Sequence, residues 1–552
     1  MGRFIRWQAI LAVAGILLLA AYLQSIVVKK ITVEIPAEGG KYREGDIGAV
    51  QYLNPLLAEY NPIDADISSL VFEGLTRVDA RGELHPCLAV NWTVSDDGRT
   101  YVFVLRPNVF WADGTPFTAD DVAFTLNLIR DSHFPGNSAW RDLWQSVQID
   151  VVDDTTIRFV LDEPFPSFPF YTTIGILPEH LLKNTSAADL LTSDFNLSPV
   201  GTGPFRVKKL TAQRVTLSRN LRYWGDKSRI TDLEFRLYPT AEALLADWQA
   251  GTLDGIGSVP PQMISALQNQ NDVQLFSAPL PQYSVVFLNL QQPDKLPFFQ
   301  SAEIRRALLM LIDRHRLVDD VLHGQGLVAQ GPFLPWQWAF NPNQLFPDYN
   351  PAAAADLLAQ AGWVDTDGDG IRDNGTQPLQ FSLLVGTDPR HTAVAENLAK
   401  QWQQAGIMVT VVQKSDTGTL ADSLAQHKFE AALVNITLFG DPDPYRFWHQ
   451  SQIDGGQNFG GWDDTAASIA LEHARAILDK NERIKDYYTF QQIFAEQTPA
   501  LVLYYPIYTF ALRSNIKNVQ LPAIASPADR FATLDRWYLL TRQVIEARED
   551  AP

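Results

Sequence analysis

The sequence predicts an α/β fold made of several units, and two observations support this prediction. The chain has 552 residues, 46% of them hydrophobic. A typical domain has about 150 residues, so this length corresponds to roughly three or four domain-sized units. Apolar residues recur at helical spacing over 392–405, Gly406 ends the pattern, and 407–412 is typical of a buried strand. The order helix, glycine, strand indicates α/β units.

Helix and strand signals also alternate in the rest of the chain. A helix is predicted after Thr118, because Thr118 and Asp121 have the spacing of a capping box. The predicted strands are 101–105, 156–161 and 498–510, and the further helices are 301–322, 351–361 and 465–496. No flexible linker separates these elements, which favours domains that interleave their segments over domains joined by tethers.

Composition and motifs exclude several classes of protein. The 63 acidic and 44 basic residues give a net charge of −19, which repels phosphate backbones, so no nucleic-acid partner is expected. Cys87 is the one cysteine, which rules out an intramolecular disulfide framework and a cysteine-cluster metal site. The hydrolase elbow, the P-loop, the dinucleotide fingerprint and the His-Glu-x-x-His motif are absent. A glycoside hydrolase stays an alternative, although no carboxylate pair stands out for it.

The amino terminus, residues 1–30, differs from the rest of the chain. Arg3 and Arg6 precede an apolar segment, and residues 7–28 are long enough to span about 30 Å of hydrocarbon. The small residues of a signal-peptide cleavage site are poorly matched at 19–21. An uncleaved membrane anchor is therefore favoured over a cleaved signal peptide, and in both cases the rest of the chain lies outside the cytoplasm.

An Asp- and Gly-rich segment has the ligands of a calcium site. Asp365, Asp367, Asp369 and Asp373 place carboxylates at spaced positions around glycine turns, as in a calcium loop. Position twelve, where that loop has a bidentate glutamate, is Thr376. Two interpretations stay open: a structural calcium site, or an Asp/Gly turn closed by hydrogen bonds from side chains to the backbone. No other cofactor is expected.

Aromatic residues gather in three segments that glycine and proline interrupt. These segments are 336–338, 445–448 and 459–462. Aromatic loops of this kind line ligand clefts, where they supply a large contact area for the ligand. The alternative for each side chain is packing between lobes.

Segments in a fixed order match a known family. Residues 70–75, 92–105 and 110–124 resemble the signature of the family 5 extracellular solute-binding proteins, the peptide-, nickel- and oligosaccharide-binding components of ABC importers. Further matches are 201–205, 285–289, 304–308, 312–314, 349–351, 361–363 and 440–445. The resemblance extends from about Leu53 to Leu512.

The resemblance implies a two-lobed periplasmic-binding-protein clamshell with an inserted subdomain, preceded by the hydrophobic N-terminal helix. By analogy, lobe I is discontinuous and comprises 31–75, 199–280 and 501–545, while 76–198 form the insertion and 281–500 form lobe II. A solute would be held between the lobes by hinge closure. It would not be transformed, so the protein is not expected to be an enzyme.

The resemblance also indicates a departure at the ligand site. Peptide-binding relatives pair the amino group of the peptide with an aspartate three residues after a tryptophan, but these positions are Leu438 and Asn435 in this sequence. Asp441 or Asp443 would replace that aspartate only after a loop shift. An unpaired ammonium in a dry cleft costs several kcal/mol, so an oligosaccharide or other uncharged polar solute is an alternative to a peptide.

The function implied by this resemblance is capture of a peptide-like solute outside the cytoplasm and its delivery to the permease subunits of an ABC transporter. The expected ligand-binding residues are Tyr283, Asp441, Tyr445, Phe459 and Trp462. The protein is expected to be monomeric and tethered by its N-terminal helix. A non-transporting solute sensor built on the same fold is the remaining alternative.

Overall fold

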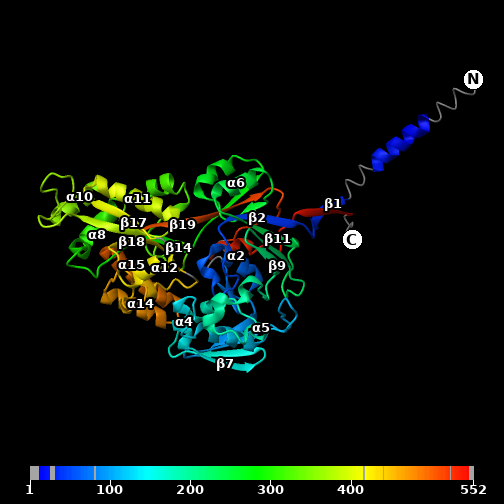
Figure 1. Ribbon diagram of the computed structural model, residues 1–552, viewed down its shortest axis with the longest axis horizontal. Coiled ribbons are helices and arrows are strands. Elements are labelled where there is room, and N and C mark those ends of the chain that lie inside the picture. The colour runs from blue at the N-terminus through cyan, green and yellow to red at the C-terminus, as the bar shows by residue number, and fades with distance from the viewer. Residues whose placement is uncertain are drawn as a thin grey trace, which may run out of the picture.

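The protein consists of two lobes that share one sheet, together with an insertion that has a sheet of its own (Figure 1). The computed structural model describes residues 11–24, 32–79, 83–414, 417–438, 440–522 and 524–545. The shared sheet contains β2 (Lys41–Ile47), β9 (Phe205–Thr211), β10 (Arg214–Arg219), β11 (Asp232–Tyr238), β12 (Gly255–Ile256), β13 (Val273–Pro279), β14 (Gln282–Leu288), β15 (Gly326–Val328), β16 (Gln380–Val385), β17 (Met408–Gln413), β18 (Ala431–Thr437) and β19 (Ala500–Arg513). Its main path is β17-β16-β18-β14-β19-β12-β2-β11-β10-β9, and β13 and β15 also pair with β19.

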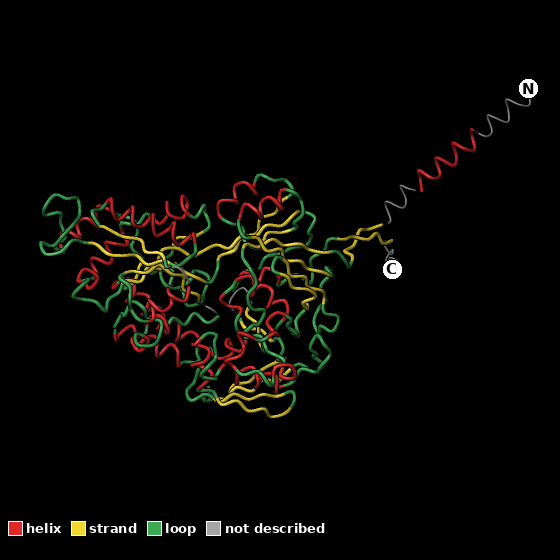
Figure 2. The backbone as a smooth tube through the Cα atoms, in the orientation of Figure 1, coloured by secondary structure: helices red, strands yellow, loops and turns green. Residues whose placement is uncertain are grey.

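One strand, β19, belongs to both halves of this sheet. We name lobe I the half with β2 and β9–β13, and lobe II the half with β14–β18. Residues 500–504 of β19 pair with β14, and residues 507–513 pair with β13. Figure 2 shows the strand crossing from one half to the other. Its side chains are buried on both faces, which is why the sequence shows a continuous apolar run there and no alternation.

Helices cover the two lobes and the insertion. Lobe I has α2 (Pro62–Val71), α6 (Ala241–Gln249) and α7 (Ile264–Gln268); lobe II has α8 (Ala302–Met310), α9 (Arg314–Arg316), α10 (Pro351–Gln360), α11 (Pro389–Gln404), α12 (Thr417–Ala425), α13 (Tyr445–Trp448), α14 (Thr465–Ala476) and α15 (Lys480–Gln497). The insertion has α3 (Ala119–Ile129), α4 (Ser138–Gln145) and α5 (Glu179–Leu182), with a sheet of β5 (Ala89–Val94), β6 (Thr100–Leu105), β8 (Thr156–Val160) and β7 (Gln148–Asp153). A hairpin of β3 (Thr76–Val78) and β4 (Leu84–Pro86) precedes that sheet.

Two of the helices predicted from the sequence are broken by internal caps. The predicted helix 301–322 ends at Met310 and restarts after Asp313, whose carboxylate accepts the N–H of Arg316 at 3.0 Å. The predicted helix 465–496 is interrupted at 477–479, because Asp479 accepts N–H groups at the start of α15. Apolar spacing continues through both breaks, so periodicity alone did not reveal them.

A buried ion cluster joins three segments of lobe I that are far apart in the sequence. Arg530, in a 3₁₀ turn at Pro527–Phe531, donates to Glu44 of β2 at 2.5 Å and to Asp66 of α2 at 2.7 Å. Tyr42 donates its hydroxyl to the other oxygen of Glu44 at 2.5 Å. Burying an unpaired charge costs several kcal/mol, so these pairs hold the C-terminal segment against β2 and α2.

The two ends of the described chain leave lobe I together. β1 (Thr32–Ala37) pairs antiparallel with β20 (Leu540–Ile545) in a separate two-stranded ribbon, and residues 11–24 form a helix beyond it (Figure 1). In the part of the chain that the structure describes, no helix, this one included, combines the length and the apolar character that crossing a membrane requires. The predicted anchor 7–28 extends into 7–10 and 25–28, which lie outside the described residues.

Candidate functional site

The carboxyl ends of parallel strands from both lobes meet at the boundary between the lobes. β16 and β18 are parallel, and both run in the direction of β19, because β14 is antiparallel to β18 and to β19. Their carboxyl ends therefore point toward lobe I. β2 is parallel to β12, which is antiparallel to β19, so the carboxyl end of β2 points toward lobe II. Ligands of α/β sheets bind outside the carboxyl ends of strands, which makes this boundary the candidate site.

On the lobe II side, a paired but accessible arginine follows β16. Arg390 Nη2 donates to Asp388 Oδ2 at 3.0 Å, and the two side chains are 55% and 32% exposed. Desolvation raises the pKa of Asp388, but the charge of Arg390, the hydrogen bonds from Arg390 and the charge of His391 together outweigh it, and the pKa is lowered. Asp388 therefore stays ionised, and Arg390 presents its positive charge at the boundary.

Two further side chains surround this arginine. His391 Nε2 lies 3.1 Å from Asn435 Oδ1 of β18, and desolvation lowers the pKa of His391, so the imidazole is neutral at pH 7. Tyr504 of β19 acts electrostatically on Arg390, and burial raises the pKa of this tyrosine to about 12. Arg390 is therefore the cation of this group at neutral pH.

On the lobe I side, Asp64 of α2 fixes the segment that follows β2. Its carboxylate accepts the N–H of Gln51 at 3.0 Å and the N–H of Tyr52 at 2.7 Å. Burial raises the pKa of Asp64, while these two backbone hydrogen bonds lower it. The backbone at the carboxyl end of β2 is thereby held in one conformation by a buried side chain.

Three of the five predicted ligand-binding residues pack within lobe II. Tyr283 is fully buried, its hydroxyl accepts the N–H of Trp448 at 3.1 Å, and burial raises its pKa. Phe459 packs edge-on against Phe287, with ring centroids 5.7 Å apart. Trp462 is buried against Trp448 at 6.4 Å. These contacts are packing contacts inside one lobe.

The other two predicted residues, Asp441 and Tyr445, contact arginines. Asp441 accepts from Arg483 through both oxygens, at 2.9 and 2.7 Å, and the two side chains are 8% and 7% exposed. Neighbouring Asp443 accepts the N–H of Tyr445 at 3.0 Å and pairs with Arg475 at 3.4 Å, while the ring of Tyr445 lies 4.5 Å from the Arg475 guanidinium. The oxygens of both aspartates are thus engaged within lobe II.

Sequence reasoning did not single out Asp388, Arg390 and His391, although a signal for them was present. Residues 380–385 are an apolar run, and Pro389 stands at the first position of α11, where proline fits a helix start. A strand, a short turn and a helix in this order place the turn at the carboxyl edge of a parallel sheet. This order therefore predicts that Asp388, Arg390 and His391, which lie between the strand and the first turn of the helix, are at the candidate site.

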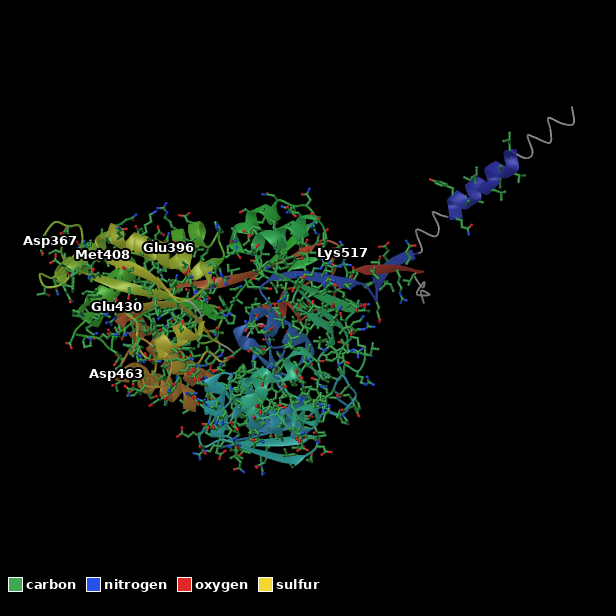
Figure 3. All side chains as sticks on the ribbon, viewed as in Figure 1. Asp367, Glu396, Met408, Glu430, Asp463 and Lys517 are labelled. Atoms are coloured by element: carbon green, nitrogen blue, oxygen red, sulfur yellow. The ribbon has the colours of Figure 1, made fainter. Side chains whose placement is uncertain are left out.

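The Asp-rich loop lies at the end of lobe II that faces away from lobe I, where Figure 3 labels Asp367. Asp365 accepts the N–H groups of Gly368 and Gly370 at 2.7 and 3.0 Å. One carboxylate oxygen each from Asp365, Asp367 and Asp373 lie within 4.8 Å of one another. Asp369 is not part of this group, and its carboxylate accepts the N–H of Ile371 at 2.7 Å. The loop therefore brings together three of the four predicted metal ligands.

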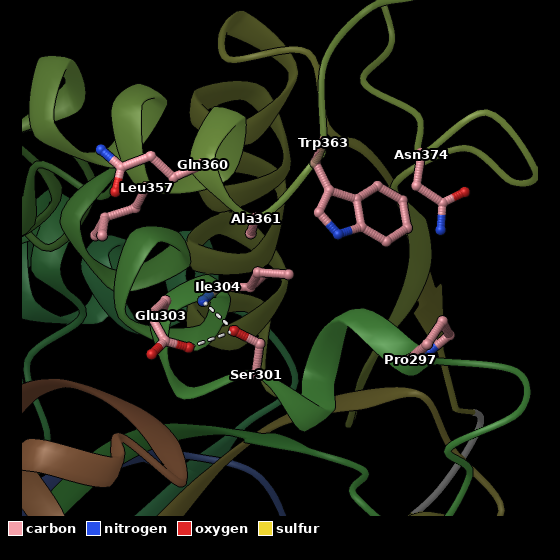
Figure 4. Close-up of a pocket in the computed structure, with 9 residues that line it drawn as sticks. All are labelled: Pro297, Ser301, Glu303, Ile304, Leu357, Gln360, Ala361, Trp363 and Asn374. Carbon is pink, nitrogen blue, oxygen red and sulfur yellow. Dashed lines mark hydrogen bonds between the residues drawn. The ribbon is translucent and has the colours of Figure 1, made fainter.

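A cavity of about 490 Å³ opens in lobe II near this loop (Figure 4). Trp363 and Asn374 line it on one side. On the other side, Ser301 donates to Glu303 at 2.7 Å and accepts the N–H of Ile304 at 3.3 Å. The serine hydroxyl therefore caps α8, and the cavity is distant from the carboxyl ends of the strands.

Comparison with solved structures identifies the class of protein. The structure of the oligopeptide-binding protein AppA from Bacillus subtilis in complex with a nonapeptide matches with a TM-score of 0.77 and 27% sequence identity. The match covers 92% of this chain and 100% of that chain. The fold is that of a two-lobed periplasmic binding protein with mixed α/β content, which confirms this part of the fold prediction.

Sequence comparison identifies the family. The family model of the bacterial extracellular solute-binding proteins, family 5 (Middle), matches residues 83–459. The chain is 28% identical to the oligopeptide-binding protein AppA of Bacillus subtilis (strain 168) over 518 residues, 91% of this chain and 92% of AppA. It is 30% identical to protein XP55 of Streptomyces lividans over 498 residues, 89% and 84% of the two chains. The chain belongs to family 5 and is a substrate-binding component of an ABC importer, as the resemblance implied.

Replacing Asp441 with Asn is expected to destabilise the fold. The change leaves the buried Arg483 without its charged partner, and breaking a buried ion pair costs about 3–5 kcal/mol. Urea denaturation followed by tryptophan fluorescence measures the loss. Asp463→Asn, at an exposed acid of the same lobe, is the matched control and is expected to change stability by less than about 0.5 kcal/mol. Equal stability of the two variants would contradict a structural role for Asp441.

Proposed function

We propose that the protein captures a carboxylate-bearing, peptide-like solute between its lobes and delivers it to permease subunits in the membrane. The observation that carries this proposal is the accessible Arg390 at the carboxyl ends of parallel strands. A guanidinium binds a carboxylate through two parallel hydrogen bonds, and the neutral His391 beside it offers a further polar contact. The complex of the relative AppA with a nonapeptide supports a peptide.

The end of the solute opposite its carboxylate is recognised without an ion pair between a solute ammonium group and the aspartates of residues 440–445. Asp441 and Asp443 are engaged by Arg483 and Arg475, and an ammonium placed beside them would compete with those arginines. The same observation supports the second candidate, an oligosaccharide or other uncharged polar solute. A solute sensor would use the same geometry, and co-purification with permease subunits distinguishes the importer from it.

We also assign domain boundaries and partners. Lobe I comprises 31–75, 199–280 and 501–545, the insertion 76–198, and lobe II 281–500. The separate sheet of the insertion and the change of pairing partner along β19 support this division. Of the predicted site residues, Tyr445 shares the Arg475 guanidinium with Phe165 of the insertion. A monomer without a nucleic-acid partner fits the net charge of −19.

Replacing Arg390 with Met is expected to weaken binding of a peptide that has a free C-terminal carboxylate. Loss of a charge-assisted hydrogen bond corresponds to about a tenfold to hundredfold weaker Kd. Isothermal titration with a peptide library, in acid and C-terminally amidated forms, measures it. The amidated peptides are expected to bind the parent weakly and to be insensitive to the change. Arg316→Met, at an exposed arginine of lobe II, is the control; equal affinity of both variants would contradict the role of Arg390.

We infer that residues 7–28 tether the protein as an uncleaved anchor. The helix over 11–24 projects from the ribbon of β1 and β20 and exposes its apolar side chains, among them Leu17 and Leu18. Exposed apolar surface of this extent indicates contact with a membrane or a partner.

An uncleaved anchor predicts that protein extracted from membranes has the intact mass of the whole chain. Replacing Leu17 and Leu18 with Asp is expected to move the protein from the membrane fraction to the supernatant. Val151→Asp and Val152→Asp, two exposed apolar residues of the insertion, serve as the control. A mass that lacks about the first 20 residues would show a cleaved signal peptide instead.

We propose that the Asp-rich loop binds one calcium ion through Asp365, Asp367 and Asp373. Their oxygens have a spacing that fits a shared cation, although the hydrogen bonds of Asp365 to the loop backbone also support the alternative of a metal-free turn. Calorimetric titration with calcium is expected to show one site, lost in Asp367→Asn and retained in Asp463→Asn. Titration without heat, together with an unchanged Tm in calcium, would establish the metal-free turn.

A further inference from the structure

The insertion touches lobe II at a place remote from its attachment to lobe I. Gly440 of lobe II packs directly on the ring of Phe170, since a Cβ at this glycine would lie 2.2 Å from the ring. Leu478, between α14 and α15, lies over Gly98 of the insertion, whose Cβ position is 3.7 Å from the leucine. In Figure 1, α14 lies on the side of lobe II that faces the insertion, and its Arg475 contacts Phe165 of the insertion. Two separate segments of lobe II therefore meet the insertion.

Arg475 of α14 is the centre of this contact. Its guanidinium lies 4.7 Å from the ring centre of Phe165 in the insertion and 4.5 Å from that of Tyr445 in lobe II. Asp443 pairs with the same guanidinium at 3.4 Å, and Tyr445 stacks on His449 at 4.1 Å. The cation is held between one ring of the insertion and one ring of lobe II, and both rings attract it.

The charges of lobe II also surround Tyr171 of the insertion. Burial raises the pKa of Tyr171; Arg446 and Arg475 lower it, and Asp443 raises it. Groups that act on one another in this way lie close together. The contact between insertion and lobe II therefore includes polar groups as well as rings.

The insertion is joined firmly to lobe I. Asn54 of lobe I donates to Asn196 at 3.1 Å, and Arg106 stacks on Trp224 at 4.1 Å. A Cβ at Gly74 would lie 2.5 Å from the backbone of Thr173, so these two segments of the chain are in direct contact. The insertion therefore moves with lobe I, and any hinge motion between the lobes must separate Phe165 from Arg475.

We propose that Phe165, Arg475 and Tyr445 form a clasp that holds the lobes closed without a solute. Arg475 is a positioning residue: it sets the proportion of closed protein and does not contact the solute. The clasp goes beyond the proposed function, because it consists of contacts between residues of the protein and does not depend on which solute binds. A solute enters through the open form, so a clasp that depopulates this form lowers the rate of capture.

Electron–electron distance measurements on spin-labelled full-length protein test the clasp. Labels at Val152→Cys in the insertion and Ile469→Cys in lobe II, residues 56% and 59% exposed, report the opening. Cys87, which is buried, is replaced with Ser in every sample. Before labelling, each sample is unfolded in guanidinium chloride and refolded, which releases any bound solute. Arg475→Met is expected to raise the ratio of open to closed protein by about fivefold.

Two further variants separate the clasp from a general loss of structure. Phe165→Leu removes the ring on the insertion side without exposing a charge, and it is expected to open the lobes as Arg475→Met does. Lys485→Met removes a cation that pairs with Glu482 on α15, and it is expected to leave the distances unchanged. Distances in Arg475→Met and Phe165→Leu that equal those of the parent would overturn the clasp. Opening in these variants without binding of any solute would support the clasp and refute the proposed function.

Discussion

The structure depends on β19, a single strand that completes the sheets of both lobes. Its first residues pair with β14 and its last with β13 and β12. Because the strand is continuous, it fixes the directions of all strands around it. The carboxyl ends of β16 and β18 then point toward lobe I, and that of β2 toward lobe II. The site at the boundary is a consequence of this arrangement.

Pairs of arginine and carboxylate are used in two different ways in this protein. Arg530 and Arg483 are buried, and the carboxylates that pair with them compensate their charges. These pairs therefore stabilise the fold. Arg390 is paired but half exposed, so it can exchange part of its hydration for a solute. Burial therefore separates structural arginines from the one assigned to binding.

The sequence predicted the elements that depend on neighbouring residues. The capping box at Thr118 and the buried strand near 500–510 are present, because both depend on neighbouring residues. The break at Asp479 was missed, since an N-cap looks like any surface aspartate when apolar spacing continues. Asp441 and Tyr283 were predicted as ligand-binding residues. In the structure, Asp441 pairs with Arg483 and the hydroxyl of Tyr283 accepts a hydrogen bond from Trp448, and both partners are distant in the sequence.

By itself, the sequence determined the α/β class and the resemblance to the family. The spacing of apolar residues, the helix caps and the order of the motifs can all be seen along the chain without knowledge of its tertiary contacts. Only the tertiary structure decided which polar residues are available to a solute. Asp388, Arg390 and Asp441 are all charged residues in or next to short connections, Asp388 as the N-cap and Arg390 in the first turn of α11, and the sequence does not distinguish them. The distinction arises from burial and from partners about 40 residues or more away, as between Asp441 and Arg483, and those exist only once the lobes are assembled.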